Sequence, residues 1–132
     1  YEESAAFVEA MDFAALHVFP YSARTGTAAA RMKQHVRSEI RNARAARLLA
    51  HSTIQTETFA RSFGGQSRPV LWEHVTGATQ DGFLNVGYTD NYVRVGCVYP
   101  RSLTGTVISA RLDDWDAARG QMNVTPMVEQ EL

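Results

Sequence analysis

The sequence predicts an α+β protein with a helical first half and a small closed barrel of five antiparallel strands in its second half. In residues 36–63 apolar side chains recur at three- and four-residue steps, which is typical of a long amphipathic helix. After Gly64 and Gly65 the pattern changes to short β-rich segments bounded by Gly, Asp, Asn or Pro. Four or five strands at this spacing favour a closed barrel, because closure removes exposed strand edges.

The first half reads as helix, strand, loop and long helix. Residues 2–11 are rich in helix formers, and the apolar run Leu16–Phe19 before Pro20 predicts a buried strand. A strand buried on both faces needs parallel neighbours. No second such strand is evident in this half, so we expect its neighbours upstream of residue 1 or in a second copy.

The second half contains four evident β-rich segments, at residues 69–75, 82–88, 92–99 and 105–112. Arg94 between two valines shows the alternation of a half-buried strand. The residues after Asp113 lack a clear period and are predicted to form a tail. The expected domains are therefore residues 1–64, an incomplete α/β piece, residues 65–113, the barrel, and residues 114–132, the tail.

Composition excludes several classes of protein. The net charge is −1, so no global basic field points to nucleic acid, and no apolar run approaches the roughly 20 residues of a membrane span. The start, Tyr1-Glu2-Glu3-Ser4, has neither the basic nor the apolar region of a signal peptide. Cys97 is the single cysteine, so the chain cannot close an internal disulfide, and we expect a cytoplasmic protein.

Two blocks of the sequence resemble one known family. The run HVFPYSARTGTAA, residues 17–29, resembles the strand and loop near the end of the radical-SAM barrel in tRNA methylthiotransferases. The block GYTDNYVRV, residues 87–95, resembles that family's TRAM domain, an OB-like barrel. The resemblance covers roughly residues 1–112, with Val36, Arg44 and Leu48 at matching helix positions. Thr25 departs from the family's Pro before the loop glycine, and Arg37 from the Pro that often opens the helix.

The resemblance implies an enzyme that uses two 4Fe–4S clusters and S-adenosylmethionine to place a methylthio group on C2 of a modified adenosine beside the anticodon. The residues of both blocks resemble the branch that acts on threonylcarbamoyladenosine more closely than the branches that act on isopentenyladenosine or on a ribosomal protein. The Cys-x-x-x-Cys-x-x-Cys triplet and three amino-terminal cysteines of the family are not in this sequence. We therefore expect an inactive carboxy-terminal fragment with no catalytic residue, metal ligand or cofactor of its own.

The loop after the predicted strand is the first candidate site. Barrel enzymes build active sites past the carboxyl ends of their strands, and the resemblance places this loop near substrate or cofactor. Alternatively, the loop only shapes a turn and Arg24 pairs with a structural carbonyl. The candidate residues are Tyr21, Ser22, Arg24, Gly26 and Thr27.

The second candidate site is an RNA-binding face on the barrel, because tyrosines interleaved with arginine suit base stacking and phosphate contact. Asn91 could instead supply the positive φ of a hairpin turn, and Trp72 is predicted to be core rather than RNA-binding. A third basic feature, the helix face of Arg37, Arg41, Arg44 and Arg47, reads either as an RNA contact or as a solvated outer helix. The candidate RNA-binding residues are Arg68, Tyr88, Asn91, Tyr92, Arg94 and Arg111.

The expected partners are the anticodon stem-loop of tRNA and the missing amino-terminal domains of the same chain. A stand-alone RNA-binding module and a protein-interaction domain are the alternatives. Apolar residues left exposed in the first half also predict self-association. The four histidines have no metal-ligand spacing, and Cys97 is predicted to be an inert core thiol.

Overall fold

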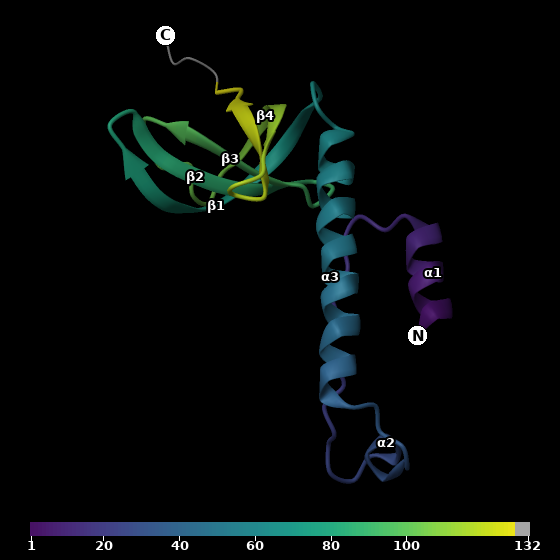
Figure 1. Ribbon diagram of the computed structural model, residues 1–132. Helices are drawn as coiled ribbons and strands as arrows, with labels where there is room; N and C mark the ends of the chain where they lie inside the picture. Colours follow the sequence, from purple (N-terminus) through teal and green to yellow (C-terminus); the bar gives the residue numbers. More distant parts are fainter. Residues whose placement is uncertain (129–132) are drawn as a thin grey trace. The chain divides into compact units, whose positions relative to one another are not determined.

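The computed structural model describes residues 1–128. The chain forms two compact units, one from Tyr1 to Thr56 and one that begins at Glu57, and each is described by itself (Figure 1). None of the helices in the described part is long and apolar enough to cross a membrane. The elements are α1 (Glu2–Met11), α2 (Ala28–Arg31), α3 (Ser38–Arg61), β1 (Ser67–Thr79), β2 (Gly82–Thr89), β3 (Arg94–Tyr99), β4 (Val107–Asp116) and β5 (Gln121–Pro126).

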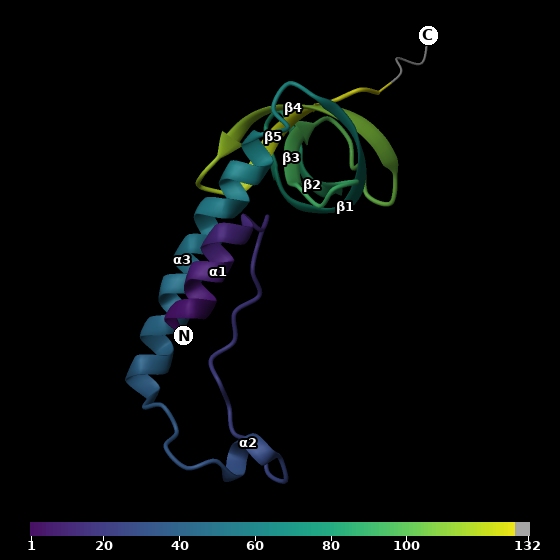
Figure 2. The same ribbon diagram turned by 90° about the vertical axis from the view of Figure 1, so that its right-hand side faces the viewer.

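The first unit is built from α1 and the first part of α3, which lie side by side in both views (Figures 1 and 2). Ala5 of α1 is completely buried. At the surface, the Arg47 guanidinium lies 3.0 Å from the Glu2 carboxylate and 3.6 Å from the Glu9 carboxylate. The predicted helices at residues 2–11 and 36–63 are confirmed to within a few residues.

The predicted strand at Leu16–Phe19 is wrong. These residues form neither strand nor helix, and Phe19 is 84 % exposed. A strand needs a neighbour for its backbone hydrogen bonds, and within residues 1–56 no strand is present. Side chains of α3 hold the segment instead: the Leu16 N–H donates to Ser52 Oγ at 2.9 Å, and the Thr56 hydroxyl donates to the Ala14 carbonyl at 3.2 Å.

The second unit contains the predicted five-stranded barrel, closed in the order β1-β2-β3-β5-β4. Figure 2 looks into this ring. The expectation that all strands are antiparallel needs one correction, because β3 and β5 pair in parallel, Val95 opposite Met122. That pairing requires a crossover between β3 and β5, which β4 and its connections supply. Register shifts at Trp72/His74 and Val75/Gly77 mark bulges that help the long β1 to curve around the barrel.

The barrel extends beyond residue 113, where the sequence pattern predicted its end. β4 continues to Asp116 and β5 occupies residues 121–126 of the expected tail. Only Met122 and Val124 of β5 point into the core, so two apolar side chains in six residues gave too weak an alternation to detect. The last part of the expected tail, residues 129–132, lies outside the described residues.

The barrel core confirms that Trp72 is a core residue. Its side chain is completely buried, and its indole N–H donates to the Ile108 carbonyl at 3.2 Å. Val70, Val95, Leu112 and Met122 surround the same interior, and the last turn of α3 closes it with Ala60. After α3 the chain turns at Gly65, which has a φ of 82° and donates its N–H to the Leu112 carbonyl at 2.7 Å. The core therefore fixes how the outward-facing side chains of β1 to β4 are displayed.

Candidate nucleic-acid interface

The turn between β2 and β3 is the most unusual backbone feature of the barrel. Tyr92 has a φ of 66°, a conformation that is a genuine outlier for an aromatic residue. Asn91, which the sequence favoured for this position, instead accepts a hydrogen bond of 2.5 Å from the Thr89 hydroxyl. Thr89 Oγ1 also accepts from the Val93 N–H at 2.9 Å, and the Tyr92 N–H donates to the Thr89 carbonyl at 3.0 Å. This network holds the strained turn in place.

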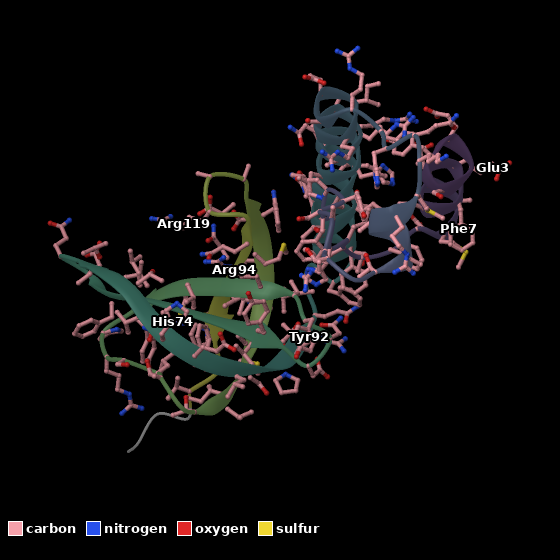
Figure 3. All side chains as sticks on the ribbon, turned by 90° about the horizontal axis from the view of Figure 1, so that it is seen from below. Glu3, Phe7, His74, Tyr92, Arg94 and Arg119 are labelled. Atoms are coloured by element: carbon pink, nitrogen blue, oxygen red, sulfur yellow. The ribbon has the colours of Figure 1, made fainter. Side chains whose placement is uncertain are left out.

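The strained turn exposes the Tyr92 ring. Tyr92 is 86 % exposed, and its ring centroid lies 6.0 Å from that of Tyr88 at an interplanar angle of 49°. Strain of this kind costs of order 1–3 kcal/mol and persists only where surrounding contacts enforce it, often at functional positions. Figure 3 labels Tyr92 in this turn, and Arg94 where β3 begins.

A row of outward-facing side chains crosses four strands beside Tyr92. The strand register pairs Val107 with Leu71, Leu71 with Tyr88, and Tyr88 with Arg94. Val107 is 68 % and Leu71 49 % exposed, whereas the flanking Val70 and Trp72 are completely buried. We call these five outward-facing residues the tyrosine surface: Leu71, Tyr88, Tyr92, Arg94 and Val107.

Most of the tyrosine surface lines a groove of about 500 Å³. Two carboxylate residues, Glu73 and Asp90, also line it. Within residues 1–128 no carboxylate lies within ion-pair distance of Arg94, so its guanidinium is available to an external anion. The groove therefore offers aromatic faces and an apolar floor. Arg94 does not line it, but adds one uncommitted positive charge beside it, opposite Tyr88 on β3.

The other arginines predicted to bind RNA are committed elsewhere. Arg68 lies at the edge of the groove, 2.8 Å from the Asp90 carboxylate and 5.2 Å from the Phe63 ring centroid. Arg111 pairs at 2.9 Å with Asp113 on its own strand. Of the six predicted residues, the structure brings together Tyr88, Tyr92 and Arg94. It places Arg68 at their margin, gives Asn91 a supporting position in the turn, and leaves Arg111 with a local partner.

The predicted loop site in the first unit is shaped by its own hydrogen bonds. Gly26 has a φ of 88°, and Thr27 caps α2 by accepting from the Ala30 N–H at 3.2 Å. The Thr27 hydroxyl donates to the Arg24 carbonyl at 2.8 Å, while the Arg24 and Ser22 side chains are exposed. These contacts match the reading in which the motif shapes a turn. The proximity of Tyr21, Ser22, Arg24, Gly26 and Thr27 to a substrate or cofactor stays a prediction.

A hollow of about 380 Å³ lies beside this loop. Tyr21 stacks on His35 there, with centroids 5.6 Å apart and rings 10° from parallel. Arg41 donates to the Tyr21 carbonyl and lines the hollow together with Lys33 and Arg44. One charge-assisted hydrogen bond thus ties the loop to α3, and the stack ties it to His35 in the segment before that helix.

The basic face of α3 is engaged by neighbours in its own unit, which favours the structural reading. Arg37 lies 3.9 Å from Glu39, the Arg44 guanidinium lies 4.7 Å from the Tyr1 ring centroid, and Arg47 pairs with two glutamates. Hydrogen bonding to Glu2, followed by the Coulombic attraction of its carboxylate, raises the pKa of Arg47.

Sequence reasoning missed a second pocket on the barrel, formed by outward-facing residues of β2, β3 and β5 with the turn after β4. It has a volume of about 50 Å³. Because residues 114–132 were read as a tail, nothing in the sequence drew attention to Arg119, Gln121 and Asn123, three of its polar members. We call it the Gln121 pocket, with Leu84, Val86, Gly96, Val98, Arg119 and Gln121 in its lining.

Cys97 also borders the Gln121 pocket and packs against the core. Burial raises the pKa of its thiol to about 11, so the group stays protonated at neutral pH. Within residues 1–128 no three His, Cys, Asp or Glu side chains gather as metal ligands. One protonated, half-buried thiol does not fit an iron–sulfur cluster.

Comparison with known proteins identifies relatives across most of the chain. It is 34 % identical over 106 residues, 80 % of its length, to threonylcarbamoyladenosine tRNA methylthiotransferase MtaB of Bacillus subtilis. It is 39 % identical over 90 residues, 68 % of its length, to the Rickettsia prowazekii protein of the same name. The chain is homologous to a segment of the tRNA methylthiotransferases. No protein-family model matches it.

The methylthiotransferase relatives include a second kind of enzyme. The chain is 30 % identical over 114 residues to tRNA-2-methylthio-N(6)-dimethylallyladenosine synthase of Oceanobacillus iheyensis. It spans less than a quarter of the length of these curated relatives: 24 %, 21 % and 22 % of the three. The homology therefore confirms the expected family.

Proposed function

We propose that this chain is the carboxy-terminal, tRNA-binding portion of a cytoplasmic tRNA methylthiotransferase. In the complete enzyme, two 4Fe–4S clusters and S-adenosylmethionine would supply the methylthio chemistry from residues outside this chain. The single cysteine, with its raised pKa, supports that division of labour. The names of the relatives support tRNA as the substrate.

We further propose threonylcarbamoyladenosine as the modified base. The two relatives named for that base are 34 % and 39 % identical to the chain, against 30 % for the dimethylallyladenosine enzyme named above. The base lies next to the anticodon in our proposal, so the barrel would hold the anticodon stem-loop.

The observation that carries RNA binding is the tyrosine surface. Exposed tyrosine rings stack on bases with little regard to sequence, and an unpaired arginine meets phosphate. Tyr92 is held exposed by a strained turn, and backbone strain of this kind clusters at binding and catalytic sites. Arg94 lies directly opposite Tyr88 in the register of β2 and β3. Base stacking and phosphate contact would therefore occur on neighbouring strands.

The test is binding of the full chain to a labelled anticodon stem-loop, at low and high salt, with two variants. Tyr92→Gly removes the ring and keeps a residue suited to positive φ, so the turn is preserved. It should weaken binding by the roughly 1–3 kcal/mol that base stacking contributes. Arg94→Gln should lower the slope of log affinity against log salt by about 1.

Arg61→Gln is the matched control for Arg94→Gln, because it removes one exposed positive charge away from the groove. Its affinity and salt slope should stay close to those of the parent chain. Absence of RNA binding at low salt, or unchanged binding by the folded Tyr92→Gly variant, would overturn the proposal. Binding that ignores salt would favour a protein-interaction surface instead.

A further inference from the structure

The Gln121 pocket contains a buried polar group that the barrel does not use. Gln121 faces outward from β5 yet is only 4 % exposed. Its side chain covers Gly96 of β3, where any Cβ would overlap the Gln121 amide nitrogen. Among the described residues, the Gln121 Oε1 atom has no hydrogen-bond partner. Native proteins rarely leave such an atom unpaired, so each case calls for an explanation.

The rest of the pocket suits the flat edge of an aromatic ring. Leu84, Val86 and Val98 provide apolar walls, and the Gln121 amide lies over Gly96. A volume of about 50 Å³ is larger than one water needs and smaller than a whole nucleotide. An amide offers both an acceptor and two donors, the set that pairs with the hydrogen-bonding edge of a nucleobase.

Arg119 stands at the side of this pocket, in the turn between β4 and β5, where Figure 3 labels it. Its backbone N–H and its guanidinium both donate to Asp116, at 3.0 and 3.1 Å. The turn is thus fixed while part of the arginine faces solvent. Barrels of this topology offer the face of their second and third strands, with the loops joining the first and fourth strands to their successors, to oligonucleotides.

The Gln121 pocket and the tyrosine surface lie along one path. Leu84, Val86 and Tyr88 alternate on the same outward face of β2, so the two sites share a strand. We propose that the Gln121 pocket receives the edge of one unpaired base of the bound RNA, which hydrogen-bonds to the Gln121 amide. This inference rests on the proposed RNA binding and adds a position at which a base is read.

The test asks which single nucleotide of the RNA depends on Gln121 for its contribution to binding. A set of anticodon stem-loops, each with one loop nucleotide made abasic, is titrated against the parent chain and against Gln121→Met. Methionine has nearly the same volume but no amide, so the barrel should remain folded. At one position, the abasic change should weaken binding to the parent chain roughly fivefold more than it weakens binding to Gln121→Met, a difference equal to the share of a single neutral hydrogen bond.

Gln66→Met is the matched control, since it makes the same chemical change at an exposed residue outside the pocket. It should retain the abasic effect. RNA binding with no position coupled to Gln121, or with equal coupling in Gln66→Met, would overturn this inference and leave the proposed function standing. Absence of any RNA binding would overturn both.

Discussion

Tyr92 shows how one residue can carry opposite demands. Its φ of 66° is unfavourable for an L side chain by about 1–2 kcal/mol. Tyr92→Gly should therefore stabilise the protein by about 1 kcal/mol while it weakens RNA binding. Denaturant unfolding followed by tryptophan fluorescence measures the first effect. Tyr92 is 86 % exposed and contributes little packing, so the loss of its ring should subtract little from the gain.

Asn91→Gly provides the comparison. Asn91 does not have a positive φ, so glycine at this position relieves no backbone strain. That variant should lose stability through the missing contact with Thr89. If Tyr92→Gly also lost stability, the turn would owe its shape to ring contacts rather than to the hydrogen bonds of Thr89.

At this scale the sequence predicted residue types better than their roles. Tyr88, Tyr92 and Arg94 could be chosen because aromatic rings near an arginine are a local pattern. The exchange of roles between Asn91 and Tyr92 depends on the Thr89 hydroxyl network, which no propensity encodes. The buried position of Gln121 depends on Gly96, which lies on β3, 25 residues earlier in the chain.

The β4–β5 turn depends on one carboxylate. A backbone hydrogen bond from Arg119, followed by one from its side chain, lowers the pKa of Asp116 below its usual 3.8. Because the pKa of Asp116 is lower in the folded state, its carboxylate stabilises the fold at pH values above the pKa that it has in the unfolded chain. This contribution is lost as the pH falls through the folded pKa.

The parent chain should therefore be more stable than Asp116→Asn near neutral pH, and this advantage should shrink below about pH 4. Denaturant midpoints measured across that range provide the comparison. Asp113 needs a parallel control, because its pKa is lowered too: partial burial acts to raise it, but hydrogen bonds from Thr125 and Arg111 outweigh that effect. An advantage of constant size at acid pH would show that the turn does not rely on the charge.

Elements were predictable where their pattern is local and strong. The 24 residues of α3 repeat an amphipathic pattern over many turns, and β1 to β4 carry dense β-branched and aromatic runs between turn residues. Leu16–Phe19 has the same apolar signature, but no strand among the described residues pairs with it. β5 was not predicted for the opposite reason. Its sequence shows only a weak alternation of apolar residues, and pairing with β3 and β4 determines its conformation.

At the scale of the whole molecule, the barrel unit has its own core and the first unit does not have a comparable one. Residues from Glu57 onward should therefore fold alone, with a cooperative transition reported by the buried Trp72. The full chain should self-associate at high concentration, because several large apolar side chains of its first unit are exposed. Examples are Phe7 at 58 %, Met11 at 50 % and Ile54 at 65 %.

Sedimentation of both proteins over a range of concentrations checks this prediction. The barrel alone should remain monomeric. A full chain that is monomeric at every concentration would contradict it, as would a barrel that aggregates by itself. The fold class and the barrel were predictable at this scale, whereas the pairing of β3 with β5 was not, because contacts between distant strands leave little trace in local sequence.

The closure of the barrel also decides when the tyrosine surface comes into existence. Its members come from four strands, and Leu71 meets Val107 only after the ends of a long stretch of chain have been brought together. During synthesis, β1, β2 and β3 can begin to pair as they emerge, but the row stays incomplete until β4 leaves the ribosome. A nascent or half-folded chain would thus lack the full tyrosine surface. Under the proposed function, affinity for RNA would report that folding is complete.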